Sequence, residues 1–204
     1  MKRMIPIILI LSAALATPPA ERAAAEPLEE SRSESRSLDL MPGGVGISFG
    51  NSRRVKGLRF NVRDEGVEEV IGLNFTLWKA GENPDAIMKG LMLGIYGPSA
   101  DELHFVSIGL ASVEAHSLIS GIAVGGGAVV CEGAMLGISI GGLANVAGSM
   151  NGIAFGGLAN VSEGFVSGIA LGGLANVAEG GVSGISIGGL ANVSEGFVSG
   201  IAVG

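Results

Sequence analysis

The chain has 204 residues, of which 48% are hydrophobic and 15% charged, and its formal net charge is −7. This hydrophobic content is enough for a core, but 36 glycines with only 4% aromatic residues are unlike an ordinary globular domain. The acidic balance, with no basic stripe to neutralise phosphates, argues against a nucleic-acid partner. We therefore expect one elongated domain that does not bind nucleic acid.

Residues 1–25 have the features of a signal peptide. Lys2 and Arg3 precede an apolar run over residues 5–15, and small residues follow, with candidate cleavage sites after Ala16 and Ala25. A membrane anchor is the alternative, although the run is shorter than the roughly 20 residues that span a bilayer. The sequence thus predicts an exported protein, and membrane contact stays open.

Residues 26–40 are charged and rich in serine, and they carry too little apolar surface to offset the entropy of ordering. We expect a disordered linker there. Residues 41–120 contain short glycine-led phrases such as GISFG (46–50) and GLRFNV (57–62) at uneven spacing, which predict irregular N-terminal β-repeats. These early coils, which carry Arg59, Arg63, Trp78 and Tyr96, are expected to cap one end.

Residues 121–204 form a regular repeat of about 16 residues. In each unit large apolar residues alternate with Ala or Ser, which indicates a strand, and Gly-Gly and Glu-Gly steps then turn the chain. Two strands and two corners in 16 residues predict an all-β fold, a parallel β-solenoid; an antiparallel β-meander or barrel is the alternative. Each repeat opens on one of the glycines Gly121, Gly137, Gly152, Gly168, Gly184 and Gly200.

Stacking in register would turn each position of the repeat into a ladder of like residues. We expect the leucines and strand isoleucines inside, as apolar stacks. Amide side chains can bond to one another along such a stack, so we also expect a structural ladder of Asn145, Asn160, Asn176 and Asn192.

A glutamate recurs at one corner of the repeat and forms a possible acidic stripe of Glu132, Glu163, Glu179 and Glu195. A solvated stripe that limits aggregation is the expected role, and a divalent-cation or ligand stripe is the alternative. The two histidines, His104 and His116, lie in no metal-binding spacing, so no metal and no cofactor is expected. Cys131 occupies a position that holds Ala or Ser in other repeats.

Three serines, Ser48, Ser139 and Ser186, lie in Gly-x-Ser-x-Gly phrases that match the hydrolase nucleophile motif. Sister repeats hold Ala at the same position, so hydroxyl chemistry is not required there. We therefore predict that the chain is not an enzyme.

The chain stops at residues 201–204, in the middle of a further predicted strand. Either the sequence is part of a longer protein, or the open sheet edge pairs with another chain. Self-association through the solenoid ends is accordingly one possible partnership, and no other partner is indicated.

The phrases GIAFGGLANVSEGFVS (152–167) and GIALGGLANVAEGGVS (168–183) resemble two groups of bacterial repeats. Over residues 46–204 they resemble surface-repeat proteins of the GLxxGLxN type first named from spirochaetes, which carry signal peptides and mostly lack an assigned activity. The last five coils are also similar to the heads of trimeric autotransporter adhesins, which are β-rolls.

These resemblances imply a protein of the bacterial periplasm, outer membrane or cell surface. We expect an exported, non-enzymatic repeat protein of the cell envelope that acts as a structural spacer or adhesin-like surface. The alternatives are an outer-membrane β-barrel and a glycan-binding β-solenoid.

Overall fold

The computed structural model describes residues 37–42, 45–81 and 83–204. The predicted signal peptide and residues 26–36 of the predicted linker lie outside the described residues. All described strands belong to one compact unit, Ser35–Gly204. The described residues include no α-helix, and hence no helix with the length and apolar character to cross a membrane.

The described part of the chain is all-β. Its strands are β1 (Ser37–Leu40), β2 (Gly46–Gly50), β3 (Arg54–Asn61), β4 (Glu69–Thr76), β5 (Ile87–Gly94), β6 (Ser99–Gly109), β7 (Ser112–Gly125), β8 (Ala128–Gly141), β9 (Ala144–Gly156), β10 (Ala159–Ser162), β11 (Phe165–Gly172), β12 (Ala175–Ala178), β13 (Gly181–Gly188), β14 (Ala191–Ser194) and β15 (Phe197–Val203).

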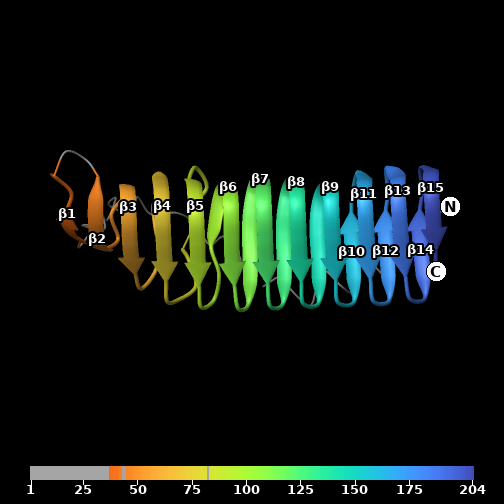
Figure 1. Cartoon of the computed structure of the whole chain (residues 1–204), viewed down its shortest axis with the longest axis horizontal. Helices are drawn as coiled ribbons and strands as arrows, with labels where there is room; N and C mark the ends of the chain where they lie inside the picture. The colour runs from red at the N-terminus through yellow and green to blue at the C-terminus, as the bar shows by residue number, and fades with distance from the viewer. Residues whose placement is uncertain (1–36, 43–44, 82) are drawn as a thin grey trace, which may run out of the picture. The chain divides into compact units, whose positions relative to one another are not determined.

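The strands stack as the coils of a parallel β-solenoid (Figure 1). A long sheet runs from β2 through β9 to β11, β13 and β15, and a short sheet runs from β9 through β10 and β12 to β14. Every neighbouring pair from β2 onward is parallel. The predicted β-solenoid is therefore confirmed, and the antiparallel meander or barrel is wrong.

Like residues face like residues from coil to coil. Gly168 pairs with Gly152 on one side and with Gly184 on the other, and Asn160 pairs with Asn145 and Asn176. The same register runs back through the irregular repeats, where Gly57 pairs with Gly72. The uneven spacing at 41–120 thus comes from loops of different length between strands of the same solenoid.

The expected interior stacks of isoleucine and leucine are wrong. In β11, Val166 and Ala170 are buried, whereas Ile169 and Leu171 are only half-buried and point outward. The corner leucines are also outside, with exposed fractions of 57% at Leu143 and 74% at Leu190. The alternation of the strand was predicted correctly, but the opposite face is buried.

The solenoid is too narrow at this end to hold large side chains. A Cβ atom at Gly172 would lie 2.3 Å from the carbonyl oxygen of Ala175 and 2.7 Å from Oδ1 of Asn176. From β9 onward, the inward positions in this part of the coil hold Gly, Ala, Ser and the flat Asn amide. The apolar core lies nearer the start of each long strand, two residues before the opening glycine or, in β6, before Phe105. Its row is Val55, Val70, Met88, Leu103, Ile119, Met135, Met150, Val166 and Val182.

Strand β1 pairs antiparallel with β2 and covers the edge of the first coil. Asp39 of β1 accepts hydrogen bonds from the hydroxyls of Ser48 (2.6 Å) and Ser52. Burial alone would raise the pKa of Asp39, but the hydroxyl donors outweigh it and the pKa lies below its usual value. The contact therefore stabilises β1 above the usual carboxyl pKa and is lost as the pH falls through the lowered pKa.

Phe105 is the one described non-glycine residue with a positive φ, 77°. It pairs with Gly90 and Gly121 in the row of opening glycines, and its side chain is 66% exposed. An L-residue in this conformation is strained by about 1–3 kcal/mol. We expect Phe105→Gly to raise the free energy of unfolding by about 1 kcal/mol, after the entropic cost of a new glycine, in denaturant titration.

The control is Phe105→Ala, which removes the same exposed ring but keeps a Cβ at positive φ. It should gain nothing. Equal stability of the Gly and Ala variants would contradict backbone strain as the cause.

Candidate functional site

The four predicted ladder asparagines lie one above another inside the solenoid. Each Nδ2 donates to Oδ1 of the next, at 2.8 Å from Asn145 to Asn160, 2.8 Å from Asn160 to Asn176 and 2.9 Å from Asn176 to Asn192. The ladder begins at Asn145 because Val129 occupies the position in the preceding coil. The amides thus link consecutive coils through the interior.

We expect Asn160→Ala to lower the free energy of unfolding by about 2–3 kcal/mol, because it breaks two buried amide hydrogen bonds and leaves Nδ2 of Asn145 without its acceptor. Chemical denaturation measures the change. The control is Ser162→Ala in the same coil, where the sister residues are Ala147 and Ala178. Its loss should stay within about 1 kcal/mol, because the Ser162 hydroxyl makes only long hydrogen bonds, 3.3 Å to Gly148 and 3.4 Å to Phe165. Equal losses in both variants would refute the ladder's role.

The predicted acidic stripe follows the corner after the short sheet, and its members are exposed. Glu163, Glu179 and Glu195 lie in consecutive coils, and the backbone N–H of each donates to the coil before it. Glu132 lies apart from these three, because Gly148 occupies the intervening coil of 15 residues. We call this edge the glutamate corner.

The glutamate corner does not gather metal ligands. Glu132 contacts His116, with 3.5 Å between Oε2 and Nδ1, and His104 contacts Glu102 in the neighbouring region. Within the described residues no three His, Cys, Asp or Glu side chains converge on a point where a cation could bind. The arrangement is that of a solvated row of like charges.

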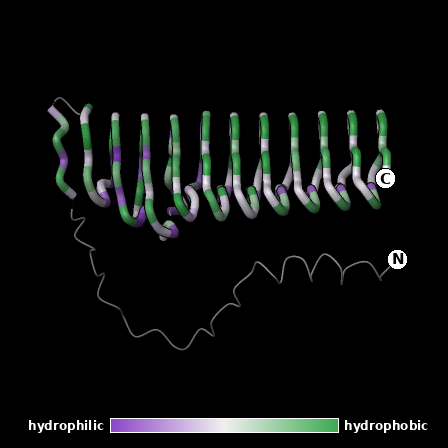
Figure 2. Tube along the Cα trace, turned by 60° about the horizontal axis from the view of Figure 1, so that its bottom comes forward, coloured by the Kyte–Doolittle hydropathy of each residue, from purple (hydrophilic) through white to green (hydrophobic). Residues whose placement is uncertain are grey.

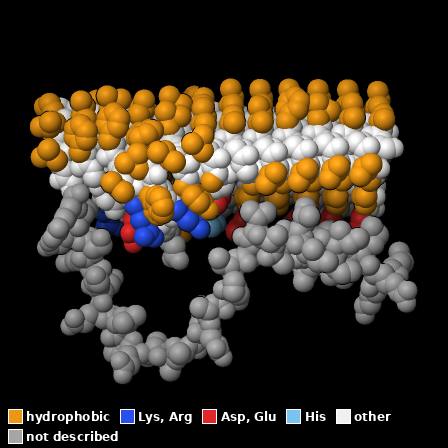
Figure 3. All heavy atoms as spheres, turned by 90° about the horizontal axis from the view of Figure 1, so that it is seen from below, with side chains coloured by type: hydrophobic (Ala, Val, Ile, Leu, Met, Phe, Trp, Pro, Cys, Tyr) orange, Lys and Arg blue, Asp and Glu red, His pale blue; other side chains and the backbone are white. Residues whose placement is uncertain are grey.

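In contrast to the charged glutamate corner, the outer surface of the long sheet is apolar. Two residues per coil, one and three positions after the opening glycine, point outward and none is buried. We call their two rows the long apolar face; Figures 2 and 3 show hydrophobic residues along it. Its members are Ile47, Leu58, Leu73, Leu91, Val106, Ile122, Ile138, Ile153, Ile169, Ile185 and Ile201 in one row, and Phe49, Phe60, Phe75, Leu93, Ile108, Val124, Ile140, Phe155, Leu171, Ile187 and Val203 in the other.

The early coils add an aromatic segment to this face. The rings of Phe49 and Phe60 stack with 5.5 Å between centroids, and those of Phe60 and Phe75 follow at 6.4 Å. The sequence analysis missed this row because the three residues lie in phrases of unequal spacing.

The early coils also hold a buried charged pair that the sequence analysis did not identify. Arg59 and Asp64 form an ion pair, and both side chains are fully buried. Asp64 also accepts hydrogen bonds from Asn74 (3.0 Å) and Thr76 (2.6 Å). Arg59 occupies the inward position that holds Ala or Ser in the later coils, and the alternation of β3 would have placed it inside.

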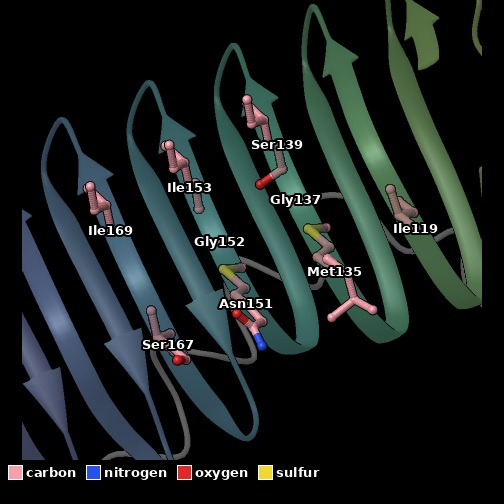
Figure 4. A pocket seen from close by; sticks show the side chains of 14 residues that line it. Ile119, Met135, Gly137, Ser139, Asn151, Gly152, Ile153, Ser167 and Ile169 are labelled. Carbon is pink, nitrogen blue, oxygen red and sulfur yellow. The ribbon is translucent and has the colours of Figure 1, made fainter. Parts of the chain in front are cut away.

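Two hollows among the described residues lie close to the features above. One lies between β7, β8, β9 and β11 and is lined by Met135, Met150 and Val166 among others (Figure 4). Its volume of about 10 Å³ is at the lower limit of roughly 10–15 Å³ that one water molecule needs. The other is an open depression beside residues 78–84, lined by Arg63, Trp78, Lys79, Glu114 and His116 among others.

The candidate nucleophiles lie inside the solenoid. Ser48, Ser139 and Ser186 are buried, and Ser186 donates to Oδ1 of Asn192 at 2.8 Å. The two histidines contact glutamates instead of serines: His104 contacts Glu102, and His116 contacts Glu132. Cys131 is buried in the row of Ala115 and Ala147, and burial raises the pKa of its thiol, which keeps it protonated near neutral pH.

No protein-family model, curated protein sequence or solved structure matches this chain.

Proposed function

We propose that the chain is an exported, non-enzymatic structural protein of the bacterial cell envelope, in which the β-solenoid serves as a spacer or adhesin-like surface. The observation that carries the proposal is the repetition of surface positions from coil to coil. A catalytic site needs a particular set of different side chains in one place. Residues 121–204 instead present the same side chains at the same position in successive coils.

Rigidity supports a structural role. From Asn145 onward each coil is joined to the next by both sheets, by hydrogen bonds at the corners and by the asparagine ladder. Because these links repeat along the stack, the distance between two surface positions is fixed by the number of coils between them. The small strand residues Ala170 and Ser186 point inward, so the outer faces present the larger apolar side chains of each coil.

Export is tested by fractionation of bacterial cells that express the full chain. We expect recovery with the envelope and loss of an N-terminal segment of about 16 or 25 residues by mass spectrometry. The matched variant carries Leu9→Arg and Leu11→Arg in the apolar run, and it should remain uncleaved in the cytoplasm. Recovery of the parent chain in the cytoplasm at full mass would refute the proposal.

Glycan binding is the second candidate, and the exposed stack of Phe49, Phe60 and Phe75 favours it, since aromatic faces pack against sugar rings. Retention of the full chain in polysaccharide-containing gels would support this function, provided that Phe60→Ala abolishes the retention and Leu171→Ala does not.

A further inference from the structure

The outline of a regular coil is amphipathic, with its apolar sector much larger than its polar one. In the coil of β11 and β12, Phe165 and Ser167 lie between the glutamate corner and the long apolar face. The outward residues after them are apolar until the next glutamate. In chain order they are Ile169, Leu171, Leu174, Ala175, Val177 and Glu179.

Because every regular coil has this outline, the apolar sector continues along the length of the solenoid. It also continues around the corner between the long and the short sheet. Beyond the long apolar face, the exposed residues Leu143, Leu158, Leu174 and Leu190 form a second corner, which we call the leucine corner. The short sheet then continues it with half-buried valines such as Val161 and Val177. Three adjoining surfaces are thus apolar, and the glutamate corner lies on the remaining side.

This apolar surface is larger than the isolated exposed hydrophobic residues of an ordinary protein would produce. Twelve members of the long apolar face are between 36% and 57% exposed and none of the face is buried, so it forms a continuous patch larger than the roughly 300–600 Å² of the largest patch on a typical monomer. A second copy packed face to face would cover only that sheet. It would leave the leucine corner and the valines of the short sheet in water, whereas a lipid phase covers all three surfaces together.

The backbone of the lateral surface satisfies the main requirement for lipid contact, which is that its polar groups are paired within the protein. The strands pair along the stack, and the corners do so as well. The N–H of Leu158 donates to the carbonyl of Leu143 at 2.7 Å, and the N–H of Leu174 donates to Leu158 at 2.7 Å. At the other edge the N–H of Glu163 donates to Ala147 at 3.1 Å.

We propose that the solenoid lies on a lipid membrane, with the long apolar face, the leucine corner and the valines of the short sheet among the acyl chains and the glutamate corner in water. This arrangement resembles that of an amphipathic helix at an interface, where an apolar face is buried and a charged face stays hydrated. It rests on the proposed envelope location and names the lipid surface as the partner.

Trp78 reports on this contact. It is the only tryptophan of the chain, and its side chain is 68% exposed. Its backbone N–H donates to the carbonyl of Val62, in the same corner row that later holds Leu143. Tyr96 lies in the next coil of this corner, with Nζ of Lys79 5.6 Å from its ring centroid. Tryptophan and tyrosine with a neighbouring lysine are the side chains that favour membrane interfaces.

The experiment adds the full chain to phosphatidylcholine vesicles and measures flotation and the quenching of Trp78 by lipids brominated on the acyl chain. We expect flotation, a blue shift of Trp78 emission and quenching by the bromines. Because binding depends on apolar area and the chain carries a net charge of −7, phosphatidylglycerol should not increase it.

Two matched triple variants locate the contact. Leu158→Glu, Leu174→Glu and Leu190→Glu place three charges at the leucine corner, in consecutive coils like the natural Glu163, Glu179 and Glu195. The control carries Ser167→Glu, Ser183→Glu and Ser199→Glu. These serines also lie in consecutive coils, in the row between the glutamate corner and the long apolar face. The leucine variant should lose about tenfold or more in vesicle partitioning, and the serine variant should bind as the parent does.

Absence of flotation and of Trp78 quenching would overturn the proposal. Equal binding of parent and leucine variant would also overturn it and assign any flotation to residues 5–15, which all variants share. A doubled mass in lipid-free buffer, lost in the leucine variant, without vesicle binding would show instead that a second copy covers the surface. Vesicle binding by a chain that fractionates with the cytoplasm would refute the proposed function and leave lipid contact intact.

Discussion

Gly168→Ala is expected to lower the free energy of unfolding by about 4–5 kcal/mol, at the extreme of single substitutions. Gly168 has φ +113° and points into the contact between coils, where an added Cβ would lie 2.2 Å from the carbonyl oxygen of Gly152. That carbonyl belongs to the parallel ladder of β9 and β11. The methyl group fits only if the two coils move apart, which breaks ladder hydrogen bonds on both sheets.

Gly66→Ala separates the clash from the conformational strain. Gly66 also has a positive φ, +61°, but no atom lies within 4 Å of the position of its added Cβ. This variant should lose only about 1 kcal/mol, the cost of an L-residue in the left-handed region. Denaturant titration of the two variants measures the difference, and equal losses would show that the close approach of the coils does not limit the fold.

The repeat of the sequence was enough to predict the solenoid and its register. Exact recurrence of Gly168, Asn176 and Glu179 in the next coil means that in-register stacking matches every position at once. The structure pairs Gly168 with Gly184 and Asn176 with Asn192. The period of two was also sufficient to predict strands in the coil. These features depend on local pattern alone.

The pattern could not predict which face of the strand is buried. Residues that alternate along a strand point to opposite faces, and the alternation is the same whichever of the two faces is inside. We assigned Ile169 and Leu171 to the interior on hydrophobicity, as is usual in soluble proteins. The width of the interior determines which side chains are buried. This width is limited by the close approach of Gly172 to Ala175 between the two sheets. Such a distance between segments appears only in the folded chain.

The buried pair in the early coils was missed for a related reason. Arg59 and Asp64 are five residues apart, across the turn that follows β3, and their spacing carries no repeat signal. The partners Asn74 and Thr76 come from the next coil. The charge cluster is therefore assembled by stacking, and a sequence reading that treats arginine as a surface residue cannot find it.

Asp64→Ala is expected to lower the free energy of unfolding by about 3–5 kcal/mol, because it leaves the charge of Arg59 buried without its counter-ion. Arg59 then loses its ion pair with Asp64. It retains only the neutral acceptors Oδ1 of Asn74 and Oδ1 of Asn51, both at 3.0 Å. Denaturant titration measures the loss, and loosening of the first coils should accompany it as faster amide exchange in β3 and β4.

Arg59→Met tests whether the unpaired charge is the cause. The register places Met92 in the same inward position two coils farther on, so a methionine fits this row. The double variant Arg59→Met with Asp64→Ala should be more stable than Asp64→Ala alone, because it removes the buried cation together with its partner. If the losses of the two single variants instead add in the double variant, the ion pair does not stabilise the early coils, and the loss of packing around Asn74 and Thr76 is the better explanation.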